Sequence, residues 1–180
     1  LPIHEALRQI HQPADEESLG NARRRFVFQE LLVLQLALAI RRWNRTERSR
    51  APALPSSAKI HSRITRLFPF QLTADQEQAI EEISYDMSQE VPMNRLLQGD
   101  VGSGKTAVAE YALLQAVAHG WQAVLMAPTE ILAIQHARTV TRDLQNSRVR
   151  IALLTGSLSA AERTERLAQI AAGEVDLVIG

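Results

Sequence analysis

The chain has 180 residues, a hydrophobic fraction of 46% and no cysteine, so it can bury an ordinary core but cannot hold a disulfide framework. Its 20 basic and 20 acidic residues cancel overall, but residues 1–70 carry 12 basic against 6 acidic residues and residues 71–180 carry 8 against 14. The longest apolar run, residues 31–40, is too short to span a bilayer, and the N-terminus has no signal-peptide pattern. We therefore expect no membrane segment, and the lack of cysteine is compatible with the cytoplasm.

Residues 1–57 are predicted to form a helical linker. The pattern indicates a short helix from Ile3 to Ile10 and a long helix that runs from acidic residues 15–18 to about Arg48. The long helix is apolar on more than one side near its middle, which is typical of a strut packed between two bodies. Arginine clusters flank that apolar part, and both DNA phosphate contact and an ordinary solvated surface remain open as explanations. The clusters are Arg23, Arg24 and Arg25 on one side and Arg41, Arg42 and Arg45 on the other.

A stretch rich in proline and serine follows at residues 49–57 and predicts an extended connection. We place the domain boundary near residues 55–65. Two further helices are expected after the connection, over residues 58–68 and 74–88, because apolar residues recur there at helical spacing.

Gln76 has two interpretations, and the residues leave both open. Thr73 and Gln76 have the spacing of a capping box, which by itself explains both. Alternatively, the Gln76 amide recognises adenine, because it offers a donor and an acceptor that suit the N6 and N7 edge of that base. Phe68 or Phe70 is able to stack on the base, although phenylalanine is more often a core residue.

Residues 99–106 read GDVGSGKT and match the phosphate-loop pattern G-x-x-x-x-G-K-[ST] at every fixed position. Glycine lets the backbone turn tightly, so that successive N–H groups point at phosphate oxygens, and the following helix adds the positive end of its dipole. Lys105 can reach the β- and γ-phosphates, and the Thr106 hydroxyl can ligate Mg²⁺. The flanks fit, since residues 94–98 are expected to form a buried strand and residues 106–119 a helix.

The remainder of the chain alternates between strands and helices, which predicts a parallel α/β sheet. Apolar, β-branched segments that are too short for helices mark the strands. The expected strands are residues 122–127, 149–154 and 175–179, and the expected helices are residues 130–144 and 160–172.

Two junctions, residues 127–130 and 155–157, follow strands at their carboxyl ends, where ligands of such sheets gather. Thr129 can simply cap the helix that follows it. The alternative is that hydroxyl and N–H groups at these junctions contact a nucleic-acid backbone. The residues concerned are Thr129, Thr155, Gly156 and Ser157.

Several motifs occur in an order that resembles the RecG family of ATP-dependent DNA helicases. The match covers residues 68–180, and the N-terminal helices resemble the segment that joins the wedge domain of that family to its motor. The helicase module of a transcription-repair coupling factor shares the phosphate-loop motif and is the alternative, but the residues at Gln98, Ser103 and both junctions favour RecG. The motifs are FPFQLTADQEQAI, PMNRLLQGDVGSGKT, MAPTEILAIQH and the run from LLTGS to GEVDLVIG.

The resemblance implies a RecA-like phosphate-loop fold, in which a parallel sheet carries helices on both faces and follows an α-helical linker. Residues 58–180 are then the first helicase lobe, and residues 1–57 join it to a wedge domain expected before Leu1. The acidic DExH box and the second lobe are expected beyond Gly180, so the chain is expected to be a fragment.

The resemblance also implies an ATP-dependent translocase of double-stranded DNA that remodels stalled forks and Holliday junctions in recombination and repair. ATP and Mg²⁺ are the implied cofactors, with Lys105 and Thr106 as catalytic residues and Thr106 as the Mg²⁺ ligand. The implied nucleotide-binding residues are Phe70, Gln76, Gly99, Asp100, Val101, Gly102, Ser103, Gly104, Lys105 and Thr106, and the implied DNA-binding residues are Thr129, Thr155, Gly156 and Ser157.

The partners expected from the resemblance are branched, double-stranded DNA and single-stranded DNA-binding protein. We expect a monomer in the bacterial cytoplasm that associates with the nucleoid. A nucleotide-binding regulatory or partner-docking module, with the long helix as its contact surface, is the alternative from a different functional class.

Overall fold

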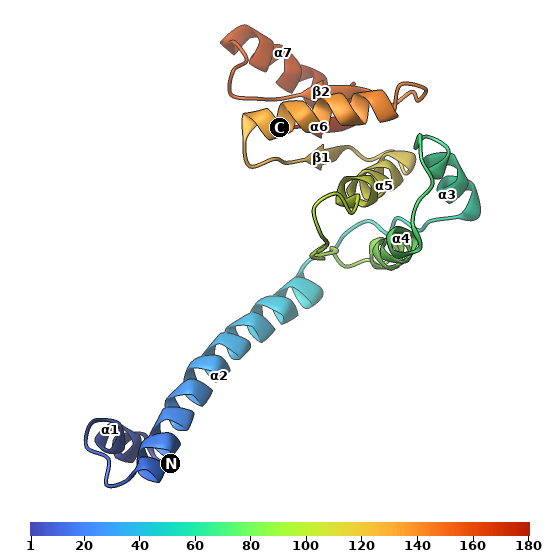
Figure 1. Cartoon of the computed structure of the whole chain (residues 1–180). Coiled ribbons are helices and arrows are strands. Elements are labelled where there is room, and N and C mark those ends of the chain that lie inside the picture. The colour runs from blue at the N-terminus through green and yellow to red at the C-terminus, as the bar shows by residue number, and fades with distance from the viewer. The chain divides into compact units, whose positions relative to one another are not determined.

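The protein divides into two compact units in a computed structural model, Leu1–Arg50 and Ala51–Gly180 (Figure 1). The structure describes residues 1–44 and 49–180 with their side chains, and Arg45 of the second arginine cluster lies outside these ranges. Within the described residues, none of the helices combines the length and the apolar character needed to cross a membrane.

The first unit consists of helix α1 (Ile3–His11) packed on helix α2 (Glu16–Arg48), which confirms the predicted short and long helices. Ala6 and Ala22 are fully buried, because small side chains let the two helices approach closely. At the start of α2, Asp15 accepts a hydrogen bond from the N–H of Ser18 at 2.7 Å. Hydrogen bonds from Ser18 lower the pKa of Asp15, as expected for an acid at a helix start.

The middle of α2 is apolar and exposed. Its large side chains are each between 43% and 61% exposed and occupy neighbouring positions along the helix, so they lie on more than one side, as predicted. A helix of this kind is usually covered by other protein, and its role as a strut stays a prediction. The side chains are Val27, Phe28, Leu31, Leu32, Val33, Leu34, Leu36, Leu38 and Ile40.

The second unit begins with three helices, and from its first strand onward strands and helices alternate in the predicted order. Every predicted helix is present, and α3 ends three residues early because Pro69 disfavours helical backbone at Phe68. Each strand keeps only the central or final part of its predicted range. The elements are α3 (Ala58–Thr65), α4 (Ala74–Met87), α5 (Lys105–Ala118), β1 (Ala123–Leu125), α6 (Glu130–Asp143), β2 (Ile151–Leu153), α7 (Ala160–Ala171) and β3 (Leu177–Ile179).

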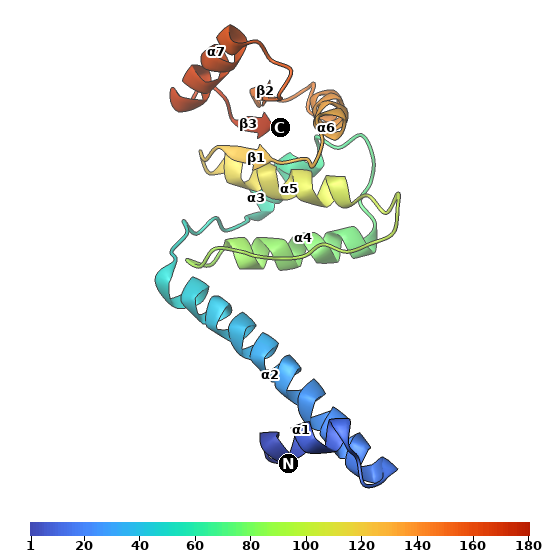
Figure 2. The same cartoon turned by 90° about the vertical axis from the view of Figure 1, so that its left-hand side faces the viewer.

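The three strands form a parallel sheet in the order β1-β3-β2, which confirms the predicted α/β class. Every residue of the central strand β3 is buried. Leu177 and Ile179 join the main core with α5 and α6, whereas Val178 packs on the other side with Ala152 and, more loosely, Ile170 of α7. This alternation follows from the two-residue period of a strand. Figure 2 accordingly shows α6 and α7 on opposite sides of the strands.

The predicted strand at residues 94–98 is wrong. In the described structure, no backbone hydrogen bond joins this segment to β1, β2 or β3. An apolar run becomes a strand only where another strand pairs with it. The segment instead runs along α4 (Figure 2), where Arg95 donates to Asp86 at 2.9 Å and to Glu82 at 2.5 Å.

The proline- and serine-rich connection is fixed to the helices by its residues 51–57, which we call the strap. The N–H of Leu54 donates to the Met87 carbonyl at 2.8 Å, and the Leu54 carbonyl accepts from the Gln115 amide at 2.6 Å. Gln115 is fully buried and also accepts from the Ser84 hydroxyl at 2.8 Å. The strap therefore satisfies a buried amide of α5.

Tyr111 of α5 and His119, the residue directly after that helix, also hold the strap. The Tyr111 hydroxyl lies 3.2 Å from the Ser56 hydroxyl, and Nε2 of His119 lies 3.0 Å from the Pro55 carbonyl oxygen. Tyr111, Gln115 and His119 are spaced four residues apart, which puts them on one face of the helix. The strap consequently follows the C-terminal half of α5.

Candidate functional site

The phosphate loop, residues 99–106, turns directly into α5, whose first two residues are Lys105 and Thr106. Gly102 and Gly104 have φ angles of +82° and +79°, in the left-handed region where residues with a side chain are strained. A Cβ atom on Gly104 would also collide with the Gln76 amide nitrogen. The backbone therefore favours glycine at Gly104, the second fixed glycine of the pattern, and at the variable position Gly102, independently of any ligand.

The Lys105 ammonium lies against the loop it belongs to. It donates to the Gly99 carbonyl at 3.0 Å and to the Asp100 carbonyl at 2.6 Å. The Asp100 carbonyl also accepts from the N–H of Ser103 at 3.2 Å, and Val101 is almost completely exposed. The Lys105 ammonium and the first N–H groups of α5 therefore lie at the same loop. A positive charge and free N–H donors are the groups that bind a phosphate.

Gln76 connects α4 to the phosphate loop. Its side chain forms the predicted capping box with Thr73, since its oxygen accepts from the Thr73 N–H at 2.9 Å and Thr73 caps α4. Its amide nitrogen donates to the Ser103 carbonyl at 2.9 Å, a contact across 27 residues that sequence spacing does not reveal. A side-chain amide has two N–H donors and two acceptor lone pairs, so one of each remains for a base.

Phe70 and Phe68 differ in their environments. Phe68 is buried in the core, and Phe70 stacks on it with ring centroids 5.5 Å apart and planes tilted by 14°. Phe70 remains 45% exposed. Of the two rings, only Phe70 therefore keeps a surface on which a base can stack.

The two junctions at the carboxyl ends of β1 and β2 meet through Glu130. Thr129 caps α6 by accepting from the Leu132 N–H at 3.4 Å, so the capping interpretation is confirmed. The Ser157 hydroxyl donates to the Glu130 carboxylate and lies 3.2 Å from the Thr155 hydroxyl. The structure therefore brings the predicted DNA-binding residues of both junctions together, and their contact with DNA stays a prediction.

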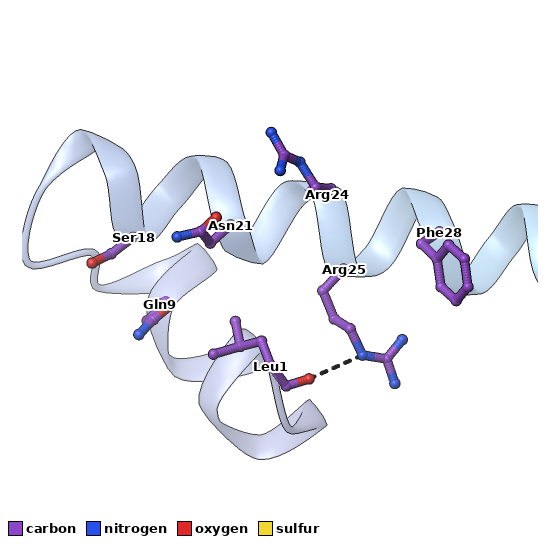
Figure 3. Close-up of a pocket in the computed structure, with 7 residues that line it drawn as sticks. All are labelled: Leu1, Gln9, Ser18, Asn21, Arg24, Arg25 and Phe28. Carbon is purple, nitrogen blue, oxygen red and sulfur yellow. Dashed lines mark hydrogen bonds between the residues drawn. The ribbon is translucent and has the colours of Figure 1, made fainter.

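The first arginine cluster borders a cavity of about 520 Å³ between α1 and α2 (Figure 3). Arg25 turns toward the N-terminus, where its Nε donates to the Leu1 carbonyl at 3.1 Å. Arg24 points away from Leu1 on the other side of the helix in Figure 3. Among the described residues of the unit, Arg25 is thus the member of the cluster with a side-chain hydrogen bond, and both explanations of the charge remain.

Glu110 on α5 is a buried carboxyl group that sequence reasoning missed. It is 2% exposed, and neither carboxylate oxygen has a hydrogen-bond partner among the described residues. Burial and the nearby Asp143 carboxylate raise the pKa of Glu110 to about 7, although Arg142 partly offsets them. The available signal was an acid in the otherwise apolar face of a predicted helix, in the run AVAEYALL.

Comparison with known proteins places the site in a family. Residues 73–180 match the family described as DEAD/DEAH box helicase. The chain is 45% identical over 177 residues to the ATP-dependent DNA helicase RecG of Bacillus subtilis, covering 98% of this chain and 26% of that protein. It is 40% identical over 182 residues to RecG of Thermotoga maritima, covering 100% of this chain and 23% of that protein. The chain thus spans about a quarter of the length of these relatives.

The fold comparison agrees with the sequences. A solved structure of RecG bound to a three-way DNA junction superposes with a TM-score of 0.82 at 40% identity, covering 97% of this chain and 24% of that chain. The predicted RecA-like fold and the resemblance to RecG are therefore both confirmed. With its phosphate loop leading into α5 and its parallel sheet, the chain belongs to the DEAD/DEAH box helicase family, and its sequence is similar to RecG.

Proposed function

We propose that this chain is the nucleotide-binding part of an ATP-dependent DNA helicase that remodels branched DNA such as stalled forks and Holliday junctions. Its relatives are named ATP-dependent DNA helicases, and one of them is seen on a three-way DNA junction. In this proposal residues 1–57 link the lobe to other parts of the protein, and residues 58–180 belong to the first motor lobe.

The observation that carries the proposal is the contact between Gln76 and Ser103. It places an amide suited to adenine directly beside the loop that begins with Gly99 and ends with Lys105 and Thr106. ATP recognition requires a phosphate site and a group that hydrogen-bonds the base, held close together. A glycine turn that binds no nucleotide requires neither of them.

Mg²⁺ fits the same loop. The Thr106 hydroxyl stands in the first turn of α5, next to Lys105, as in other phosphate-loop proteins where this hydroxyl binds the ion. When bound, Mg²⁺ neutralises charge on the phosphate oxygens. Lys105 holds a second positive charge at the phosphates, and the glycine backbone supplies N–H donors around them.

The proposed contact with DNA rests on the two junctions that follow β1 and β2. Thr129, Thr155, Gly156 and Ser157 follow the carboxyl ends of β1 and β2, and Glu130 joins the two junctions. Hydroxyl and backbone N–H groups are common contacts to phosphate and sugar. We assign this edge of the sheet to the DNA backbone, in a protein that works at the bacterial nucleoid.

Gln76→Glu is expected to reduce the preference of the chain for ATP over GTP by about tenfold, the effect of losing roughly one good hydrogen bond. Glutamate still accepts the Thr73 N–H and so keeps the capping box, but it can donate neither to the Ser103 carbonyl nor to adenine N7. Titration of the chain with fluorescent ATP and GTP analogues measures the preference.

The matched control is Gln78→Glu, because Gln78 is exposed on the same helix and its side chain hydrogen-bonds only Glu82 among the described residues. It should leave the preference unchanged. An unaltered preference in Gln76→Glu, with ATP still bound by the loop, would remove Gln76 from base recognition.

Thr155→Val combined with Ser157→Ala is expected to weaken binding of forked DNA by about tenfold, since the exposed Ser157 hydroxyl is lost together with the buried Thr155 hydroxyl beside it. The slope of affinity against salt should not change, because no phosphate-neutralising cation is removed. Fluorescence anisotropy of a labelled fork at several salt concentrations measures both. Thr164→Ala on α7 is the control, because among the described residues that hydroxyl bonds only the Ala160 carbonyl, and an equal loss there contradicts the assignment.

A further inference from the structure

A groove of about 900 Å³ lies in the second unit, and its lining includes no residue of the phosphate loop or of the two junctions. It is formed by α3, the C-terminal half of α5 and residues 146–149, and it is bordered by Asp176. Val149 and Asp176 precede β2 and β3, so the groove opens at the amino edge of the sheet. The proposed DNA contacts follow the carboxyl ends of the strands, at the opposite edge.

The floor of the groove is apolar and its rim is positively charged. Lys59, Arg63 and Arg148 line the rim, and within the described part of the chain none of the three side chains forms an ion pair or a hydrogen bond. The one acid of the lining, Asp176, is held by Arg150 at 2.6 Å and is thereby neutralised. The apolar residues of the lining include Ile60, Ile64, Leu67, Leu114, Val117 and Val149.

We propose that this groove binds an acidic peptide segment of a partner protein, with apolar side chains on the floor and carboxylates at Lys59, Arg63 and Arg148. The volume is that of a pocket that accepts a few side chains. Three cations without partners around an apolar floor complement a segment in which acidic and apolar residues alternate.

Other occupants fit the groove less well. Single-stranded nucleic acid is bound by cations interleaved with aromatic rings, and none of the lining residues is aromatic. A second copy of the chain, related by a two-fold axis, would bring the same cations face to face. The acidic peptide is the occupant that uses both the charge and the floor.

The first experiment uses a short fluorescein-labelled peptide of alternating aspartate and leucine, titrated with the 180-residue chain and followed by anisotropy. We expect at least about tenfold weaker binding when the aspartates are replaced by asparagine or the leucines by serine. Equal affinity for the asparagine peptide overturns the role of the cations, and equal affinity for the serine peptide overturns the role of the floor.

The second experiment changes the protein. Arg63→Glu with Arg148→Glu should weaken peptide binding by about tenfold or more, because two attractions become repulsions. Arg23→Glu with Arg24→Glu alters the net charge equally on exposed positions of α2 and should have little effect. Ala118→Trp, on the exposed end of α5, should also weaken binding by filling the groove. Thermal unfolding and ATP titration of each variant check that the fold and the nucleotide site are intact.

Three outcomes overturn the proposal. The first is equal loss of peptide binding in the groove and α2 variants. The second is that oligothymidylate binds more strongly than the peptide and that Arg63→Glu with Arg148→Glu weakens its binding. The groove would then be a nucleic-acid site. The third is a dimer in sedimentation that the groove variants dissociate, which makes it an interface between copies. None of these depends on whether the phosphate loop binds ATP, so the proposed function is tested separately.

Discussion

Lys105→Ala is expected to weaken binding of ATP to this chain by about 100-fold or more. A hydrogen bond to a charged group is worth about 1.5–3 kcal/mol, and the ammonium is placed to serve both the β- and the γ-phosphate. Isothermal titration with a non-hydrolysable ATP analogue measures the loss directly. Binding is the right readout, because phosphoryl transfer needs further catalytic groups besides the loop.

The chain supplies its own control, since Lys59 is the only other lysine in the sequence. Lys59→Ala removes the same charge on α3 and should leave ATP affinity unchanged. Lys105 also braces the loop through the carbonyls of Gly99 and Asp100. Thermal unfolding must therefore accompany the titration, and full ATP affinity in a folded Lys105→Ala protein would contradict the assigned phosphate site.

Glu110→Gln is expected to stabilise the second unit by up to about 3 kcal/mol at about pH 8 and by little at about pH 5. The pKa of Glu110 is raised from 4.5 to about 7 in the folded chain, chiefly by burial. At a pH between these two pKa values, Glu110 is protonated in the native state and ionised in the unfolded state. Folding stability is therefore greatest below the unfolded pKa and is lost as the pH rises through the folded one.

Urea unfolding followed by circular dichroism at several pH values measures this dependence. Glutamine has the same shape but no charge, so the variant should show a flatter profile than the unaltered chain. Glu81→Gln, at an exposed position of α4, is the matched control and should change stability by less than about 0.5 kcal/mol. Parallel profiles for Glu110→Gln and the unaltered chain would mean that Glu110 is not a buried titrating group.

Much of the fold was predictable because its signals are local. Helix starts at Thr73, Thr129 and Ser159 are set by side chains that bond within the next turn, and all three caps form. Gly120 and Gly173 end α5 and α7 with positive φ angles, as glycine after a helix suggests. The phosphate loop is equally local, since its residues are consecutive.

What was not predictable depends on distant contacts. The strand order cannot be deduced from apolar runs, and residues 94–98 show that such a run need not pair at all. The bond from Gln76 to Ser103 joins positions that no spacing rule connects. Glu110 stands out in the sequence as an acid within an apolar run, but its burial without a hydrogen-bond partner among the described residues is known only from the packing of α5. The groove is invisible in the sequence because Arg148 lies 85 residues after Arg63, and only the fold brings it beside the two cations of α3.

The strap has a practical consequence for dividing the protein into smaller pieces. Composition suggests starting a minimal version at Ala58, after the prolines and serines. Such a piece would lack the Leu54 carbonyl that the fully buried Gln115 amide needs, and the strap partners of Tyr111 and His119. A start at Ala51 keeps all of these contacts and coincides with the beginning of the second compact unit. The proline-rich residues are therefore part of the smallest piece that retains the support of α5.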